Sequence, residues 1–240
     1  METERTAEAP PSEEQVPGTP WPPYDKWYHV VLRWVIRVTV RFLFALLGRL
    51  RIEGAANIPR TGGVILAPNH VSAADWPCTG VACPRELRWM AKAELFDLPV
   101  IGPFCKLHHS FPVHRGTADR ASLRLAEHIL RQGHALVIFP EGQVSEDGLL
   151  QPFKHGMALV ALRTGVPVVP VGLLGTERLV PYGSNIPRPV WKPVRIRFGE
   201  PLRFRDLWDP ATEGPGVPPR RAIEAATART EAAVRELVEQ

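Results

Sequence analysis

With 240 residues, the chain is long enough for one sizeable α/β core, and a second full domain would be tight. Hydrophobic and charged residues make up 45% and 22%, which is ordinary for a globular domain, and the formal charge of +4 favours anionic partners without choosing among lipid headgroups, phosphorylated substrates and nucleic acid. The three cysteines are too few and too unevenly spaced for a disulfide framework or a four-cysteine zinc site, so we expect reduced thiols.

Residues 1–26 form a leader rich in proline and glutamate. This composition cannot bury a core, so we expect the leader to be disordered. It also lacks the basic and apolar start of a secretory signal peptide. We therefore expect the protein to stay in the cytoplasm.

Residues 27–50 are predicted to form an amphipathic helix. Arg33, Arg37 and Arg41 interrupt an apolar stretch at a spacing of four, which places them on one stripe of a helix. Each arginine would cost about 2.5–3.5 kcal/mol at the centre of a bilayer, so a helix lying in the membrane interface is favoured over a spanning one. The alternative is a helix that packs on the core and exposes its arginines to solvent.

Residues 51–240 are predicted to form one catalytic domain. Short apolar runs at 63–67, 135–139 and 166–173 indicate buried strands, and 194–198 alternates like a strand with one wetter face. Helices are expected at 121–132, 156–164 and 220–238, and a proline-rich loop at 209–219. The pattern predicts a largely parallel central sheet flanked by helices, with ligands beyond the carboxyl ends of its strands.

Two loops at such strand ends carry candidate catalytic groups. His70 and Asp75 follow the 63–67 strand, and they can meet if their segment is a turn leading into a helix with Pro77 in its first turn. A carboxylate that accepts the proton of one imidazole nitrogen leaves the other nitrogen free to act as a general base. Glu141 and Gly142 follow the 135–139 strand. The alternative is a histidine bonded to a loop carbonyl and an aspartate that only caps the helix.

Arg115 follows a third apolar run, 110–113, and can bind a phosphate through two parallel hydrogen bonds. Its alternative is a surface pair with an acidic neighbour. A metal site formed by His108, His109 and His114 lacks cysteine or carboxylate partners at ligand spacing, so we expect no metal.

Taken together, residues 50–204 resemble the glycerophospholipid acyltransferase family. Asn69, His70 and Asp75 match its first motif, in which four residues separate a histidine from an aspartate. The residues from Phe139 to Ser145 match the third motif except at Gln143 and Val144. Arg115 matches the second motif, whose usual glycine is replaced by His109, and the 166–171 strand matches the fourth.

The resemblance implies an acyltransferase fold and an O-acyltransferase of phospholipid biosynthesis, with His70 as the base and Asp75 as its partner. The expected acyl donor is acyl-CoA or acyl carrier protein, and the expected acceptor is a lysophospholipid, most simply 1-acylglycerol 3-phosphate. The third motif of the family has an arginine that can bind the phosphate of the acceptor, and Val144 stands at its position here. Phosphate binding therefore falls to Arg115, Lys92 or Lys154, or else the acceptor lacks that phosphate. The substrate-binding residues that we expect are Asn69, Lys92, Arg115, Glu141, Gly142 and Lys154.

Several further expectations follow. No cofactor is required, because the acyl thioester is itself a substrate. The enzyme is expected at the cytoplasmic face of the cell membrane, bound to the lipid surface as a peripheral or monotopic protein. Glycerol 3-phosphate or another lysolipid remains an alternative acceptor, and a non-catalytic lipid-binding protein remains an alternative function. We expect no nucleic-acid partner, because no basic face with interleaved aromatic residues occurs outside the 27–50 helix.

Overall fold

The computed structural model describes residues 26–114, 119–184, 186–213 and 216–239. Nearly all of the predicted leader, and Arg115 as well, therefore lie outside the described residues. Seven strands form one sheet in the order β1-β7-β6-β2-β5-β3-β4. All neighbouring strands are parallel except the antiparallel pair β6 and β7. The strands are β1 (Arg51–Glu53), β2 (Val64–Pro68), β3 (Leu87–Lys92), β4 (Ser110–Val113), β5 (Ala135–Val137), β6 (Val168–Leu174) and β7 (Arg195–Phe198).

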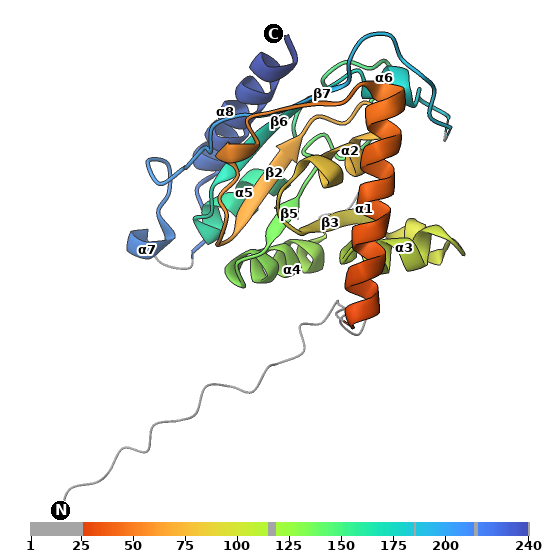
Figure 1. The fold of residues 1–240 in the computed structure, drawn as a ribbon. Coiled ribbons are helices and arrows are strands. Elements are labelled where there is room, and N and C mark those ends of the chain that lie inside the picture. The colour runs from red at the N-terminus through yellow and green to blue at the C-terminus, as the bar shows by residue number, and fades with distance from the viewer. Residues whose placement is uncertain (1–25, 115–118, 185, 214–215, 240) are drawn as a thin grey trace, which may run out of the picture.

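Helices cover both faces of the sheet (Figure 1). Residues of α1 and α2 share one apolar cluster with the strands, and residues of α4, α5 and α8 share a second cluster on the opposite face. The central strands β2 and β5 are buried along their whole length because side chains on both faces meet a helix layer. The helices are α1 (Trp27–Gly48), α2 (Asp75–Ala82), α3 (Ile101–Leu107), α4 (Arg120–Arg131), α5 (Gly156–Thr164), α6 (Thr176–Leu179), α7 (Pro210–Glu213) and α8 (Arg220–Glu239), with 3-10 turns at Ala55–Asn57 and Ala93–Asp97.

The predicted fold class is confirmed: the structure is α/β with a mostly parallel sheet between helix layers. The predicted helices at 121–132, 156–164 and 220–238 correspond to α4, α5 and α8, and each predicted strand is present with its bounds shifted by one or two residues. The loop expected at 209–219 is wrong in part, because Pro210–Glu213 forms the short helix α7. Proline suits the first turn of a helix, since that turn leaves its N–H groups unbonded.

Candidate functional site

The site lies where β2, β5 and β6 end at the same edge of the sheet. The loop after β2 runs from Asn69 to Ala74 and leads into α2, which begins at Asp75 and has Pro77 in its first turn, as predicted. The loop after β5 contains Glu141 and Gly142. Because β2 lies between β5 and β6, loops that are far apart in the sequence meet around His70.

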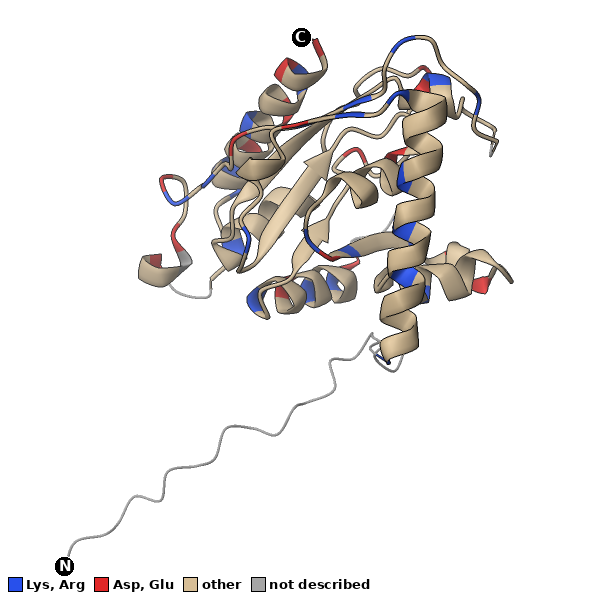
Figure 2. Cartoon of the chain, in the orientation of Figure 1, with Lys and Arg blue, Asp and Glu red and all other residues tan. Residues whose placement is uncertain are grey.

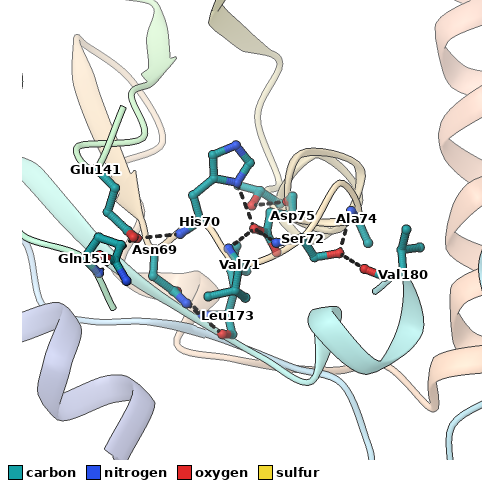
Figure 3. Close-up of polar contacts among 11 residues, drawn as sticks. Asn69, His70, Val71, Ser72, Ala74, Asp75, Glu141, Gln151, Leu173 and Val180 are labelled. Atoms are coloured by element: carbon teal, nitrogen blue, oxygen red, sulfur yellow. Dashed lines mark hydrogen bonds and ion pairs between the residues drawn. The ribbon is translucent and has the colours of Figure 1, made fainter. Parts of the chain in front are cut away.

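His70 and Asp75 form a buried pair (Figure 3). Nδ1 of His70 lies 2.9 Å from Oδ2 of Asp75, and the same oxygen accepts hydrogen bonds from the backbone N–H groups of Val71 (2.6 Å) and Ser72 (2.8 Å). Asp75 is fully buried, and His70 is 8% exposed. Since the carboxylate only accepts hydrogen bonds, Nδ1 carries the proton and the other ring nitrogen, which points away from Asp75 in Figure 3, is left with a free lone pair. This is the geometry that a general base requires.

Glu141 holds the backbone of the histidine loop. One of its carboxylate oxygens accepts a 2.7 Å hydrogen bond from the N–H of His70, and the other accepts a 2.9 Å bond from the N–H of Gln151. Burial raises the pKa of the Glu141 carboxyl to about 7; the two N–H groups oppose this, and the charges of Asp75 and Asp147 add to it. Because both oxygens accept hydrogen bonds from backbone groups, Glu141 positions His70, and its predicted contact with substrate stays a prediction.

Asn69 has a similar positioning role. Its amide nitrogen donates to the carbonyl of Leu173 (3.0 Å), and its amide oxygen accepts from the N–H of Leu173 (2.7 Å). The side chain thus continues the pairing of β2 with β6 beyond the end of β2. Asn69 is 3% exposed and both polar ends of its amide are bonded to the backbone, so it holds the loop in place, and its predicted contact with substrate stays a prediction.

Gly142 closes the turn after Phe139 and Pro140. It has a φ of +77°, in the region that favours glycine, and its N–H donates to the carbonyl of Phe139 at 3.1 Å. This bond keeps the N–H of Gly142 within the turn, while the predicted contact of Gly142 with substrate stays a prediction. A Cβ atom at this position would lie 2.7 Å from Nζ of Lys154, so the absence of a side chain lets Lys154 extend across the turn.

Two neighbouring apolar cavities lie near His70 and Asp75. The first, of about 140 Å³, is lined by His70 and by residues of β3, α3 and β4. The second, of about 310 Å³, lies beneath α1 and shares Trp76, Trp89, Phe104 and His108 with the first. Trp76, Trp89 and Phe104 lie on α2, β3 and α3, so no local sequence pattern groups them. Phe139, which belongs to the matched third motif, stacks its ring on His70 at a centroid distance of 4.0 Å, and no local pattern predicts this contact.

The predicted cationic residues lie on two sides of Phe139. Lys92 ends β3 and lines the cavity beside His70, where Nζ lies 3.3 Å from Oε1 of Glu94. Lys154 lines a third cavity of about 400 Å³, which shares Met90 and Phe139 with the first. The described residues therefore place two lysines next to the cavities around Phe139, while Val144 supplies no charge.

His109 stands where the family's second motif has glycine, and its backbone conformation explains why glycine is preferred at this position. Its φ is +54°, a left-handed conformation that costs a residue with a Cβ roughly 1–2 kcal/mol. Nε2 of His109 lies 3.2 Å from Oε1 of Glu86. The pKa of Glu86 is lowered to about 2, mainly by the hydrogen bond from His109 and further by the charge of Arg33, while burial opposes the change. Within the described residues, no group of three histidine, cysteine or acidic side chains could hold a metal ion.

The three arginines of the α1 stripe all bond to the protein, with Arg33 and Arg37 half-buried and Arg41 exposed. Arg37 and Arg41 donate to the carbonyls of Cys83 and Val81 at the C-terminal end of α2, and Arg33 forms a 2.9 Å ion pair with Glu86. Arg37 and Arg41 thereby stabilise the partial negative charge at the C-terminal end of α2. The alternative with solvated arginines is therefore wrong for Arg33 and Arg37, although Phe44 and Gly48 of α1 are buried, as a core-packing helix requires. The rest of the α1 surface exposes large apolar side chains: Trp27, Val31, Trp34, Val35, Val38, Phe42 and Leu46.

No helix in the described part of the chain combines the length and hydropathy needed to cross a membrane. Figure 2 shows basic positions along α1, which agrees with the arginine stripe.

Comparison with known proteins relates this site to one family. A profile of the acyltransferase family matches residues 49–174. The 1-acyl-sn-glycerol-3-phosphate acyltransferase of Bacillus subtilis is 30% identical over 173 residues, which cover 70% of this chain and 81% of that protein. A chloroplastic 1-acyl-sn-glycerol-3-phosphate acyltransferase of Brassica napus is 33% identical over 137 residues, or 56% of this chain, and the match spans only 40% of that longer protein.

A solved structure is also similar. The crystal structure of the 1-acyl-sn-glycerophosphate acyltransferase PlsC from Thermotoga maritima superposes with a TM-score of 0.67 and 26% sequence identity. The superposition covers 87% of this chain and 80% of that one.

Proposed function

The chain belongs to the acyltransferase family, and from this premise we propose that it transfers a fatty acyl group from an acyl thioester to the free hydroxyl of a lysophospholipid. The observation that carries the proposal is the hydrogen bond between Nδ1 of His70 and the buried Asp75 carboxylate, in a loop at the edge of the sheet. The proposed donor is acyl-CoA or acyl carrier protein, and no further cofactor takes part.

In the proposed reaction, His70 removes the proton of the acceptor hydroxyl while the hydroxyl oxygen attacks the carbonyl carbon of the thioester. The bond from carbon to sulfur then breaks, and the leaving thiolate takes the proton from the imidazolium. Asp75 stabilises the imidazolium and holds the ring in place through the 2.9 Å contact. Glu141 and Asn69 position the loop that carries the base. The apolar cavity beside His70 and its continuation beneath α1 suit a hydrocarbon chain.

The proposed acceptor is 1-acylglycerol 3-phosphate, which would be converted to phosphatidic acid in phospholipid biosynthesis. Lys92 and Lys154 support this choice because both line cavities that meet at Phe139, and Arg115 is proposed to assist from the second motif. One observation favours a second candidate. Val144 removes the arginine of the third motif, so glycerol 3-phosphate or a lysolipid with a different headgroup is an alternative acceptor.

The proposed location is the cytoplasmic face of the cell membrane. The exposed apolar face of α1 supports this, because its Trp34, Phe42 and Leu46 are 63%, 70% and 68% exposed. A monomeric protein rarely leaves such a continuous apolar face in water. We propose that α1 lies in the lipid interface with this face toward the acyl chains, while its arginines hold the catalytic domain.

The test is incubation of the protein with labelled acyl-CoA or acyl carrier protein and a panel of lysophosphatidic acid, glycerol 3-phosphate and lysophosphatidylcholine. His70→Ala should lower kcat/KM by about 10²–10⁴-fold, since it removes the general base. His128→Ala on α4 is the control and should retain activity. Equal activity in the two variants would overturn the mechanism. Binding of lysolipids without transfer to any of them would favour the lipid-binding protein.

A further inference from the structure

The segment 181–194, described except for residue 185, links α6 to β7 and is attached to the C-terminal end of α1. The N–H of Val190 donates to the carbonyl of Leu47 at 2.9 Å, and the N–H of Val194 donates to that of Gly48 at 2.8 Å. Between these two bonds, the carbonyl of Trp191 accepts from Nη1 of Arg49 at 3.3 Å. Trp191, Lys192 and Pro193 therefore form a tip that is fixed relative to α1.

The exposed side chains of this segment are apolar or cationic. Trp191 is 93% exposed, Ile186 73% and Tyr182 55%. Arg188 and Lys192 are exposed beside them, and no acidic residue occurs between positions 181 and 194. Figure 2 shows basic positions on this segment, in the loop at the upper right. Tryptophan and tyrosine next to lysine and arginine are typical of protein surfaces at the level of lipid headgroups.

The segment continues the exposed face of α1. Phe42 and Leu46 lie in the last two turns of α1, next to the attachment points at Leu47 and Gly48. In Figure 1 the segment extends from the end of α1 away from the sheet. A fully exposed tryptophan fixed at the end of an apolar helix face has no packing role in the described structure.

We propose that the described residues of the segment 181–194 form a second membrane anchor, which binds an anionic lipid bilayer together with α1. The proposal rests on the interfacial location proposed for α1. A single helix on a bilayer can roll about its own axis, and a second contact beside one end prevents this rotation. Trp191 enters the headgroup region, and Arg188 and Lys192 attract anionic headgroups. The second anchor thereby sets how the catalytic domain is turned toward the lipid surface.

The test measures partition of the full chain to phosphatidylglycerol and phosphatidylcholine vesicles by sedimentation, without substrates. Trp191→Ala should lower the partition coefficient about tenfold on both, as expected for loss of a large apolar contact. The double variant Arg188→Gln/Lys192→Gln should bind phosphatidylglycerol vesicles about 25-fold more weakly, since each cation near an anionic surface contributes about fivefold. On phosphatidylcholine, the same variant should change by less than twofold.

The matched control is Arg203→Gln/Arg205→Gln, which removes two exposed cations from the segment before α7, at the far end of the molecule from α1 (Figure 1). An equal loss in this control, wild-type binding by either tip variant, or no vesicle binding by the wild type would overturn the proposal. Thermal unfolding should be unchanged by Trp191→Ala, because this side chain makes no core contact at 93% exposure.

Further outcomes separate this inference from the proposed function. If Trp34→Ser on α1 abolishes binding while Trp191→Ala has no effect, the second anchor is overturned and the docking of α1 stands. If vesicle binding depends on Trp191 but no lysolipid is acylated, the proposed activity is overturned and the anchor stands.

Discussion

Replacement of Asp75 by asparagine tests the catalytic pair most directly, because it removes the charge and keeps the shape. The charge centres of an imidazolium and a carboxylate that share a 2.9 Å contact lie about 4 Å apart. At an effective dielectric constant of about 20, their attraction is about 4 kcal/mol. Because about 1.4 kcal/mol of barrier corresponds to a tenfold change in rate, Asp75→Asn should lower kcat/KM by about 10³-fold.

The same variant should lose stability for a separate reason. Oδ2 of Asp75 accepts three hydrogen bonds, so the asparagine oxygen is expected to take that place and its amide nitrogen to take the place of Oδ1. Oδ1 is buried without a hydrogen-bond partner among the described residues. A buried amide donor without a partner costs roughly 1–3 kcal/mol.

The assay is steady-state acyl transfer with the best donor and lysolipid from the panel, together with chemical denaturation of each variant. Asp206→Asn, which loses a surface pair with Arg229, is the matched control and should stay within twofold of the wild type. His70→Ala/Asp75→Asn should be no less active than His70→Ala alone, since the two groups act as a unit. Retention of more than a tenth of wild-type activity by a folded Asp75→Asn would refute the reasoning.

Two further predictions concern the loop after β5. The folded-state pKa of Glu141 is about 7 and lies above its ordinary value of 4.5, so the folded protein holds a proton that the unfolded chain releases between these pH values. The free energy of unfolding of the wild type, measured relative to that of Glu141→Ala, should therefore fall by up to about 3 kcal/mol between pH 4.5 and pH 7 and stay constant above pH 7. The two proteins are compared by urea titrations at each pH, and a difference that does not change with pH would contradict the prediction. Gly142→Ala should lose about 1–2 kcal/mol of stability, because its φ of +77° is unfavourable for alanine. The added Cβ should also displace Lys154, which would raise the KM for phosphate-bearing acceptors. An unchanged KM would show that Lys154 does not bind the acceptor.

Much of the core followed from local patterns. The continuous apolar runs that became β2, β5 and β6 require burial on both faces, and only a sheet between two helix layers provides it. The carboxyl ends of parallel strands share one edge, so the placement of His70 and Glu141 at strand ends was sufficient to predict that their loops meet. The close pairing of His70 with Asp75 also depended on local sequence, because the partners are five residues apart and a helix begins at the aspartate.

Other features required contacts between distant parts of the chain. The amide of Asn69 binds a backbone 104 residues away, and this partner exists only once β2 and β6 are paired. The antiparallel direction of β7, the stacking of Phe139 on His70 and the cavities between α1, α2 and α3 likewise have no local signal. The left-handed backbone of His109 could not be predicted either, because the usual signal for this conformation is a glycine and this sequence has a histidine there.

The helix at 27–48 shows the division most clearly. The spacing of Arg33, Arg37 and Arg41 by itself determined that one stripe is cationic and the rest apolar. Which side faces the protein was decided only by the tertiary structure, because apolar side chains suit a core and a bilayer equally well. The guanidinium groups bind carbonyls at the end of α2, and these acceptors come together only when α2 has packed beside α1. The apolar side is consequently left outward, where the sequence alone could not place it.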